Sequence, residues 1–262
     1  MERRKQVRQA ATRRYVQDIK SGDVWSVFKI IADFVQGYDE LGELGPSVTV
    51  FGSARTHEDD PYYVKAMELG EKLGQNGFNV ITGGGPGIME AANRGAIRHK
   101  ERSESIGLNI ELPEEQVANP YTTKSQRFDY FFSRKVMLVK YSMAYVIFPG
   151  GYGTLDELFE ALTLIQTGKM IAQRVFIFGS DFYAPLMEFF KNSLLAQGTI
   201  SQADLDLLCL TDDVDYIVEE IGFSLRAQML ELQEEGLEQT KYYQLLQNYF
   251  EDRHIREGKD SR

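Results

Sequence analysis

The sequence predicts an α/β fold, namely a Rossmann-like, doubly wound parallel sheet with helices on both faces. From Ser47 onward, short apolar runs alternate with longer segments of helical periodicity, which is typical of successive β-α-β units. Three of the apolar runs lead directly into glycine-containing loops, and in a parallel sheet such loops lie together at the carboxyl edge. We therefore expect about six or seven strands in one sheet, with further helices at both ends of the chain.

The individual elements are predicted from the length and periodicity of each segment. Apolar runs of four to six residues predict strands at 48–52, 79–82, 105–110, 128–131, 144–148 and 175–178, and 207–210 is a candidate seventh. Helical spacing predicts helices near 61–76, 86–99, 133–142, 154–167, 183–196 and 213–222. Together these elements define one Rossmann-like domain at 47–222.

The region before this domain, residues 1–46, has two parts. Residues 1–20 hold seven Lys or Arg and two acidic residues, a local charge of +5 in an otherwise acidic chain. This arm is either a solvated basic helix or a segment that docks on the acidic surface of a sister subunit. Apolar residues at helical spacing, from Val24 to Val35, predict an amphipathic helix at 22–40 that packs on a core or on a partner.

The region after the domain, residues 223–262, is rich in Leu, Gln, Glu and Tyr. Apolar side chains recur at helical spacing between Leu225 and Phe250, which predicts one or two helices used for packing or oligomer contact. The terminal helices offer more apolar surface than one face of a sheet needs. We therefore expect a homo-oligomer, either a dimer or a hexamer.

The overall composition excludes several classes of protein. A formal net charge of −10 is the opposite of what a general nucleic-acid binder needs to neutralise phosphates, so we expect no nucleic-acid partner. No apolar stretch is long enough to cross a membrane and no signal-peptide core is present, so we expect no membrane partner and no export. A single cysteine, Cys209, excludes an internal disulfide and indicates the reducing cytoplasm. His57, His99 and His254 are scattered without metal-ligand spacing, so we expect no metal site and no cofactor.

Three loops hold the residues that suggest chemistry. They read Gly52-Ser53-Ala54-Arg55, Gly83-Gly84-Gly85-Pro86-Gly87-Ile88-Met89-Glu90 and Pro149-Gly150-Gly151-Tyr152-Gly153-Thr154-Leu155-Asp156-Glu157. Glycines after a strand let the backbone approach a ligand, and the N–H groups at the start of the next helix attract a phosphate. Two such glycine-rich loops in one sheet favour a nucleotide. Neither contains Gly-Lys-Ser/Thr or a strict Gly-x-Gly-x-x-Gly, so we expect neither a P-loop ATPase nor a dinucleotide-dependent dehydrogenase.

A purely structural interpretation of the same loops is also open. Thr154 and Glu157 have the spacing of a capping box that closes a helix N-terminus, and Gly85-Pro86 fits an N-cap followed by a proline at the first helical position. The glycines in 149–157 exceed what a helix cap needs. For this reason we favour ligand binding for that loop.

The nine residues from Pro149 to Glu157 resemble the PGGxGTxxE signature of the LONELY GUY family, whose members were once mislabelled lysine decarboxylases. The resemblance extends from about Ser47 to Thr167 and includes Gly52-Ser53, the triple-glycine loop with Met89-Glu90, and Ser133-Arg134-Lys135. The helix before Ser47 and the long tail resemble the longer bacterial branch of that family rather than the short plant-type enzymes. The resemblance implies a hydrolase that cleaves nucleoside 5′-monophosphates, such as AMP or cytokinin riboside monophosphates, to free base and ribose 5-phosphate.

The resemblance also implies which residues form the site. It assigns catalysis to Arg134 and Glu157, and it assigns binding of the phosphate to Gly150, Gly151, Gly153 and Thr154. The rest of the nucleotide pocket would come from the loops after the first two strands and from the segment before the signature, namely Gly52, Ser53, Gly83, Gly84, Gly85, Met89, Glu90 and Lys135.

The chemistry of N-glycoside cleavage agrees with this assignment. The reaction passes through an oxocarbenium-like sugar, which a carboxylate such as Glu157 can stabilise while it orients or deprotonates water. Arg134 could hold that carboxylate, contact the phosphate or ribose, or stabilise the leaving base, although its position alone also fits an arginine on a helix surface. Two other classes stay open. One is a non-catalytic carrier of a nucleotide or of molybdenum cofactor, and the other is an oligomeric scaffold, which would leave the glycine loops without a purpose.

Overall fold

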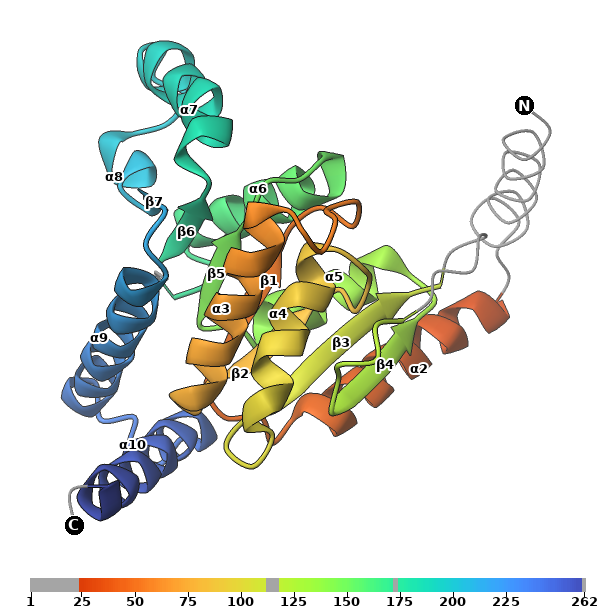
Figure 1. Ribbon diagram of the computed structural model, residues 1–262, viewed down its shortest axis with the longest axis vertical. Coiled ribbons are helices and arrows are strands. Elements are labelled where there is room, and N and C mark those ends of the chain that lie inside the picture. Colours follow the sequence, from red (N-terminus) through yellow and green to blue (C-terminus); the bar gives the residue numbers. More distant parts are fainter. Residues whose placement is uncertain (1–23, 112–117, 172–173, 261–262) are drawn as a thin grey trace.

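The structure is a computed structural model that describes residues 24–111, 118–171 and 174–260 (Figure 1). The basic arm at 1–20 lies outside these residues. The described chain folds into a wholly parallel, seven-stranded sheet with helices on both faces, so the predicted Rossmann-like fold and the candidate seventh strand are confirmed. In this part of the chain, no helix combines the length and apolar character needed to cross a membrane.

The strands lie in the order β4-β3-β2-β1-β5-β6-β7. They are β1 (Ser47–Phe51), β2 (Asn79–Thr82), β3 (Ser105–Ile110), β4 (Lys124–Phe128), β5 (Ala144–Ile147), β6 (Val175–Phe178) and β7 (Leu208–Thr211). Every residue of β1, β2, β5 and β6 is buried. Parallel strands that are covered on both faces consist of uninterrupted apolar residues. For this reason these four strands were predicted within one residue of their bounds.

The helices form two groups, one on each face of the sheet. One face is covered by α3 (Pro61–Gln75), α4 (Ile88–Ala96), α9 (Val214–Glu234) and α10 (Lys241–Asp260), and the other by α2 (Val24–Leu41), α5 (Phe131–Lys140) and α6 (Tyr152–Gln166). Each group closes its own apolar core against the sheet. Two further helices, α7 (Ser180–Phe189) and the short α8 (Gln202–Leu205), lie between β6 and β7 in the chain and project beyond the sheet in Figure 1.

The strand predicted at 128–131 is wrong. The chain instead forms β4 at Lys124–Phe128 and begins α5 at Phe131. Because β4 is an edge strand, its side chains alternate between exposed and buried, and only Gln126 and Phe128 are buried. The apolar run that suggested a strand therefore consists of the end of β4 and the start of a helix.

The C-terminal tail packs on its own domain. The helix predicted at 213–222 is the first half of α9, which continues to Glu234 without a break. Leu225 and Leu246 are buried in the same core as α3 and α4. The Tyr249 hydroxyl donates a hydrogen bond to the Asn76 carbonyl oxygen over 3.0 Å, which fixes α10 against the end of α3.

The sheet has a single point at which its order reverses. From β1 the chain proceeds to one side through β2, β3 and β4, and then returns to add β5, β6 and β7 on the other side. Open α/β sheets bind ligands in the crevice at such a switch point, beyond the carboxyl ends of the strands. The loops after β1 and β5 are therefore where a ligand is expected.

Candidate active site

Two main-chain hydrogen bonds join the loops at the switch point. The N–H of Ser53 donates to the carbonyl oxygen of Pro149 over 3.0 Å, and the N–H of Ile88 donates to the carbonyl oxygen of Ser53 over 3.1 Å. Gly52 permits this approach, since a Cβ at that position would lie 2.5 Å from Ile88 Cγ2. The loops after β1, β2 and β5 consequently form one connected rim.

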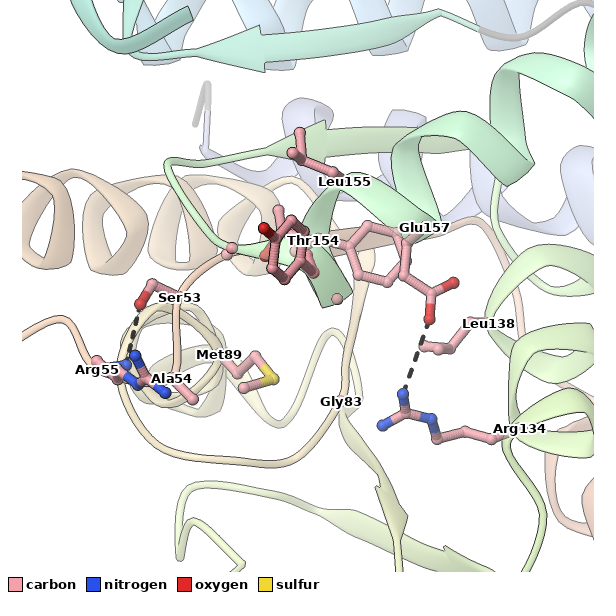
Figure 2. Close-up of a pocket in the computed structure, with 15 residues that line it drawn as sticks. Ser53, Ala54, Arg55, Gly83, Met89, Arg134, Leu138, Thr154, Leu155 and Glu157 are labelled. Atoms are coloured by element: carbon pink, nitrogen blue, oxygen red, sulfur yellow. Dashed lines mark hydrogen bonds and ion pairs between the residues drawn. The ribbon is translucent and has the colours of Figure 1, made fainter.

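A pocket of about 700 Å³ opens inside this rim, which is within the usual range of small-molecule sites. It is lined by Phe51, Gly52, Ser53, Ala54, Arg55, Gly83, Met89, Arg134, Leu138, Gly151, Tyr152, Gly153, Thr154, Leu155 and Glu157. Figure 2 shows Arg134 and Glu157 facing each other at one side of the pocket, the loop with Ser53 and Arg55 at the other, and Met89 between them.

Arg134 of α5 and Glu157 of α6 form a buried pair of opposite charges. Their nearest atoms, Arg134 Nη2 and Glu157 Oε1, are 3.7 Å apart, which is an ion-pair distance but longer than a hydrogen bond. Arg134 Nε and Glu157 Oε2 are buried and have no hydrogen-bond partner among the described residues. Since buried polar atoms are normally hydrogen-bonded, these two atoms have unused hydrogen-bonding capacity in residues that line the pocket.

Burial raises the pKa of Glu157 to about 7, although the positive charges of Lys135 and Arg134 act to lower it. Near neutral pH this carboxyl group is therefore divided between its protonated and ionised forms, as suits a general base. Burial also lowers the pKa of Arg134, while the charges of Glu157 and Asp156 act to raise it. The guanidinium nevertheless keeps its proton at any pH at which the protein is folded.

The start of α6 brings main-chain N–H groups to the same pocket. The helix begins at Tyr152 after the N-cap residue Gly151, and the N–H groups of Tyr152 and Gly153 have no acceptor within the helix. The N–H of Thr154 already donates to the Gly151 carbonyl oxygen at 3.0 Å. A Cβ at Gly151 or Gly153 would meet no atom within 4 Å, whereas a Cβ at Gly150 would lie 2.1 Å from Thr154 Oγ1. Gly150 is thus required by packing, while Gly151 and Gly153 leave open space beside a positively polarised helix end.

Both capping interpretations of the sequence are wrong. Thr154 lies inside the first turn of α6 and no side chain caps that helix. The N-cap of α4 is Gly87, with a φ of 72°, and not Gly85. In each case glycine forms the cap itself, so that backbone rather than a side chain lies at the helix end.

A buried polar network supports the triple-glycine loop from the protein interior. The hydroxyl of Thr82 accepts from the Gly84 N–H at 3.0 Å and donates to Asn93 Oδ1 at 2.6 Å. The Asn119 amide donates to the carbonyl oxygen of Gly85 at 3.2 Å and to Asn93 Oδ1 at 3.1 Å. Gly84 has a φ of 68°, which glycine adopts more readily than other residues. Gly84 and Gly85 therefore shape the loop.

Gly83 leaves room for the Met89 side chain and lies beside Arg134. A Cβ at Gly83 would lie 2.8 Å from Met89 Sδ and 3.6 Å from Arg134 Nη1. The guanidinium thus lies between the backbone of this loop and Glu157.

The structure brings most of the residues predicted for the site into one pocket, namely Gly52, Ser53, Gly83, Met89, Arg134, Gly151, Gly153, Thr154 and Glu157. The pocket lining does not include Gly84, Gly85, Glu90, Lys135 or Gly150. Glu90 accepts a hydrogen bond from the Tyr63 hydroxyl at 2.9 Å instead.

Lys135 lies behind the pair rather than in the pocket. Its Nζ atom is 2.8 Å from carboxylate oxygens of both Asp156 and Glu160. Burial lowers the pKa of Lys135, but the hydrogen bonds to these two carboxylates outweigh that effect and the pKa is raised overall. Lys135 lines a separate groove of about 860 Å³ instead.

Two polar residues of the predicted loops, Arg55 and Tyr152, line the pocket although no role was assigned to them from the sequence. Arg55 follows Ser53 in the first loop and donates its N–H to Ser53 Oγ at 3.1 Å. Tyr152 is 95% exposed at the start of α6. The sequence signal for Arg55 was its place in the loop after the first strand, two residues beyond Ser53. Over the described part of the chain, no group of three or more His, Cys, Asp or Glu side chains could hold a metal ion.

The fold and the site define an α/β protein with a buried arginine–glutamate pair beside a glycine-lined helix N-terminus, at the switch point of a parallel sheet. A sequence model of the family described as "possible lysine decarboxylase" matches residues 89–221, half of the chain. The chain therefore belongs to this family, the LONELY GUY family.

Two curated relatives are similar over about half of the chain. The cytokinin riboside 5′-monophosphate phosphoribohydrolase LOG of Oryza sativa subsp. japonica is 29% identical over 154 residues, 58% of this chain and 62% of that protein. The pyrimidine/purine nucleotide 5′-monophosphate nucleosidase of Escherichia coli (strain K12) is 29% identical over 132 residues, 48% of this chain and 29% of that protein. The match thus spans less than two thirds of either relative.

Among solved structures, the molybdenum cofactor carrier protein of Chlamydomonas reinhardtii superimposes with a TM-score of 0.52 at 22% sequence identity. The superposition covers 70% of this chain and 99% of that protein. At this identity the likeness establishes the shared fold.

Proposed function

We propose that this protein hydrolyses the N-glycosidic bond of nucleoside 5′-monophosphates, releasing free base and ribose 5-phosphate. The observation that carries the proposal is the buried pair of Arg134 and Glu157, each with an unpartnered polar atom, in the pocket that also contains the start of α6. A carboxylate and a phosphate-binding helix end are the two groups that this reaction needs.

The phosphate end of the substrate fits the N-terminus of α6. The open space at Gly151 and Gly153 lets phosphate oxygens reach the first-turn N–H groups without a steric clash. The positive end of the helix dipole favours a dianion there. A nucleoside without its phosphate would lose these contacts, and we expect it to be a poor substrate.

The glycosidic end of the substrate then lies at Glu157. As the bond between C1′ and the base nitrogen breaks, its electron pair stays with the base and positive charge develops on the ribose. The Glu157 carboxylate stabilises that charge and accepts a proton from the water molecule whose oxygen bonds to C1′. The departing base takes up a proton from solvent and Glu157 returns its proton to solvent, so that neutral base and ribose 5-phosphate are released. Arg134, 3.7 Å away, is a fixed positive charge that orients the carboxylate and keeps part of it ionised.

The names of the two relatives support this reaction type, since one acts on cytokinin riboside monophosphates and the other on purine and pyrimidine monophosphates. They differ in the base, and the choice of base is an outcome of the test. A net charge of −10 gives no reason to expect nucleic acid as the substrate, and a single cysteine fits a reducing, cytoplasmic location.

The test is chromatography of reactions with AMP, GMP, CMP, UMP and isopentenyladenosine monophosphate, each beside the Glu157→Gln variant. Base and ribose 5-phosphate should appear with the unmodified protein and not with the variant. Adenosine serves as the substrate without phosphate. Tight binding of a monophosphate with no release of base from any of the five would contradict hydrolysis and favour a nucleotide carrier.

We also propose that the protein self-associates through one exposed apolar surface. Along α2 and the first turns of α5, nine large apolar side chains are more than a third exposed, namely Val24, Trp25, Val27, Phe28, Ile31, Val35, Phe131, Phe132 and Val136. A patch of this kind is unusual on a soluble monomer. A second copy of the chain would bury it.

A further inference from the structure

The helix that carries Arg134 has no N-terminal cap of its own. The N-cap residue of α5 is Tyr130, and its side chain makes no capping hydrogen bond. The cap comes from Asp33, in the middle of α2, whose carboxylate accepts the N–H groups of Asp129 at 3.1 Å and Tyr130 at 3.2 Å. The same carboxylate accepts the Ser133 hydroxyl at 2.6 Å. Three donors at the start of α5 thus converge on one acid from another helix.

The contact between α2 and α5 is narrow and close. Only three residues of α2 are buried, Asp33, Gly37 and Leu41, which follow one another at intervals of one helical turn. A Cβ at Gly37 would lie 2.8 Å from Met137 Sδ, so this glycine lets α5 approach α2 directly. The buried stripe of α2 therefore fixes where α5 begins and how it is rotated.

The capped turn leads directly to the arginine. Ser133 precedes Arg134 in the chain, and the N–H of Arg134 donates to the carbonyl oxygen of Tyr130 at 3.2 Å. Asp33 thus binds both ends of the first turn of α5, and the guanidinium projects from the next residue. That guanidinium lies beside both Gly83 and Glu157.

We propose that Asp33 is a positioning residue for Arg134: it fixes the first turn of α5 so that the guanidinium lies beside Glu157. The kinetic effects expected of Asp33 variants rest on the proposed function, whereas the expected change in the position of Arg134 does not. It gives α2, a helix outside the sheet, a direct role in the geometry of the pocket. Asp33 touches no substrate and acts only through α5.

The test compares Asp33→Ala and Asp33→Asn with an alanine variant of another helix cap, that of α9. Asp213 caps α9 through the N–H groups of Asp215 at 2.9 Å and Tyr216 at 3.1 Å, and α9 carries no residue of the pocket. Both alanine variants should lower the melting temperature, and Asp33→Ala by more, because Asp33 is buried and accepts from three donors whereas Asp213 is exposed. The kcat for a nucleoside monophosphate should fall at least about tenfold in Asp33→Ala and less in Asp33→Asn, and it should stay within about twofold in Asp213→Ala.

Two further measurements separate positioning from a general loss of structure. Binding of ribose 5-phosphate should be unchanged in Asp33→Ala, since the proposed phosphate site is on α6, so that kcat falls and substrate binding does not. In a background that already contains Arg134→Ala, the Asp33→Ala change should have no further effect on kcat, because both act through one group. Additive losses, or equal losses in the Asp33 and Asp213 variants, would overturn the proposal.

If the unmodified protein releases no base, the proposed function fails but the role of Asp33 in placing Arg134 can still be tested by structure. Crystal structures of the unmodified protein and of Asp33→Ala would give the separation of Arg134 Nη2 and Glu157 Oε1, which is 3.7 Å here. We expect the variant to lengthen it beyond ion-pair distance. The same separation and the same start of α5 in both structures would refute the positioning role.

Discussion

The N–H of Ser53 and the carbonyl oxygen of Pro149 form a 3.0 Å hydrogen bond between loops that are almost a hundred residues apart in the chain. This bond crosses the switch point of the sheet and joins the loop after β1 to the loop that begins α6. Because backbone atoms make it, it holds the two sides of the pocket together whatever side chains line them.

Replacing Glu157 by Gln should reduce kcat/KM by about 10³-fold, because an amide can neither accept the proton of water nor stabilise a positive sugar. Glu160→Gln is the matched control, since Glu160 lies one turn further along α6 and pairs with Lys135 outside the pocket. Release of base, followed by chromatography, should change only a few-fold in that control. Equal activity of the two variants would remove Glu157 from the mechanism.

The dependence of activity on pH should report the ionisation of Glu157. Since burial raises its pKa to about 7 and the ionised form is the active one, kcat/KM should rise with pH up to about 7 and then level off. Lys135→Met removes the charge that most lowers this pKa, so the rise should move to higher pH. Initial rates from pH 5 to pH 9 would decide this. A profile that is flat across pH 7 would contradict it.

The same ionisation should reduce the stability of the folded protein at high pH. The pKa of Glu157 is higher in the folded than in the unfolded chain, so its contribution is fully present below about pH 4.5 and is lost as pH rises through about 7. Glu157→Gln has no such loss. We therefore compare the free energy of unfolding of Glu157→Gln with that of the unmodified protein by urea denaturation at pH 5 and pH 8. The difference, variant minus unmodified protein, should increase by about 1–3 kcal/mol between these two pH values. An advantage that does not depend on pH would show that Glu157 ionises normally.

Alanine substitutions at two glycines near the start of α6 should have different effects, one on substrate binding and the other on the stability of the fold. Gly153→Ala places its methyl group in open space, so folding should be unaffected or favoured by up to about 1 kcal/mol. That methyl group occupies the proposed phosphate site, so KM should rise at least about tenfold. Gly150→Ala is the opposite case, since its Cβ would overlap Thr154 and should destabilise the fold by about 1–3 kcal/mol. Thermal melts and saturation curves of both variants distinguish these effects.

Self-association should depend on the exposed surface of α2. Light scattering should give at least twice the chain mass of 29.9 kDa for the unmodified protein. Phe28→Asp should yield a monomer, whereas Val64→Asp, at a comparably exposed apolar position on α3, should not. A monomeric mass for the unmodified protein would end this proposal.

How far the sequence predicts this structure depends on the burial of each element. The central strands were predicted within one residue because burial on both faces makes them apolar throughout, as in Val48–Phe51. At the edge of the sheet, β4 contains Lys124 and Arg127, so it lacks the apolar run by which the central strands were recognised. The aromatic residues that follow it led to the wrong strand prediction at 128–131. Helix starts were displaced for another reason. At Gly87 and Gly151 the cap is a glycine, which leaves no side-chain signal.

The site shows the same division between local and distant information. The glycine loops could be found because their residues are adjacent in the chain. Arg134 and Glu157 were identified through the family resemblance, since on residue type alone Arg134 also fits a helix surface. Asp33 could not be found at all. Its partner Ser133 is a hundred residues away, and only the packing of α2 on α5 brings the two together.

Trp25 gives the chain a built-in optical probe. It is the single tryptophan in the sequence, and its indole is 72% exposed in the first turn of α2, with the Phe28 ring 5.8 Å away. Indole fluorescence shifts to shorter wavelength when water is excluded from the ring. Asp33, which joins α2 to α5, lies about two turns further along the same helix. If a second copy of the chain covers α2, the emission of Trp25 should shift to shorter wavelength, which reports the contact without any added label.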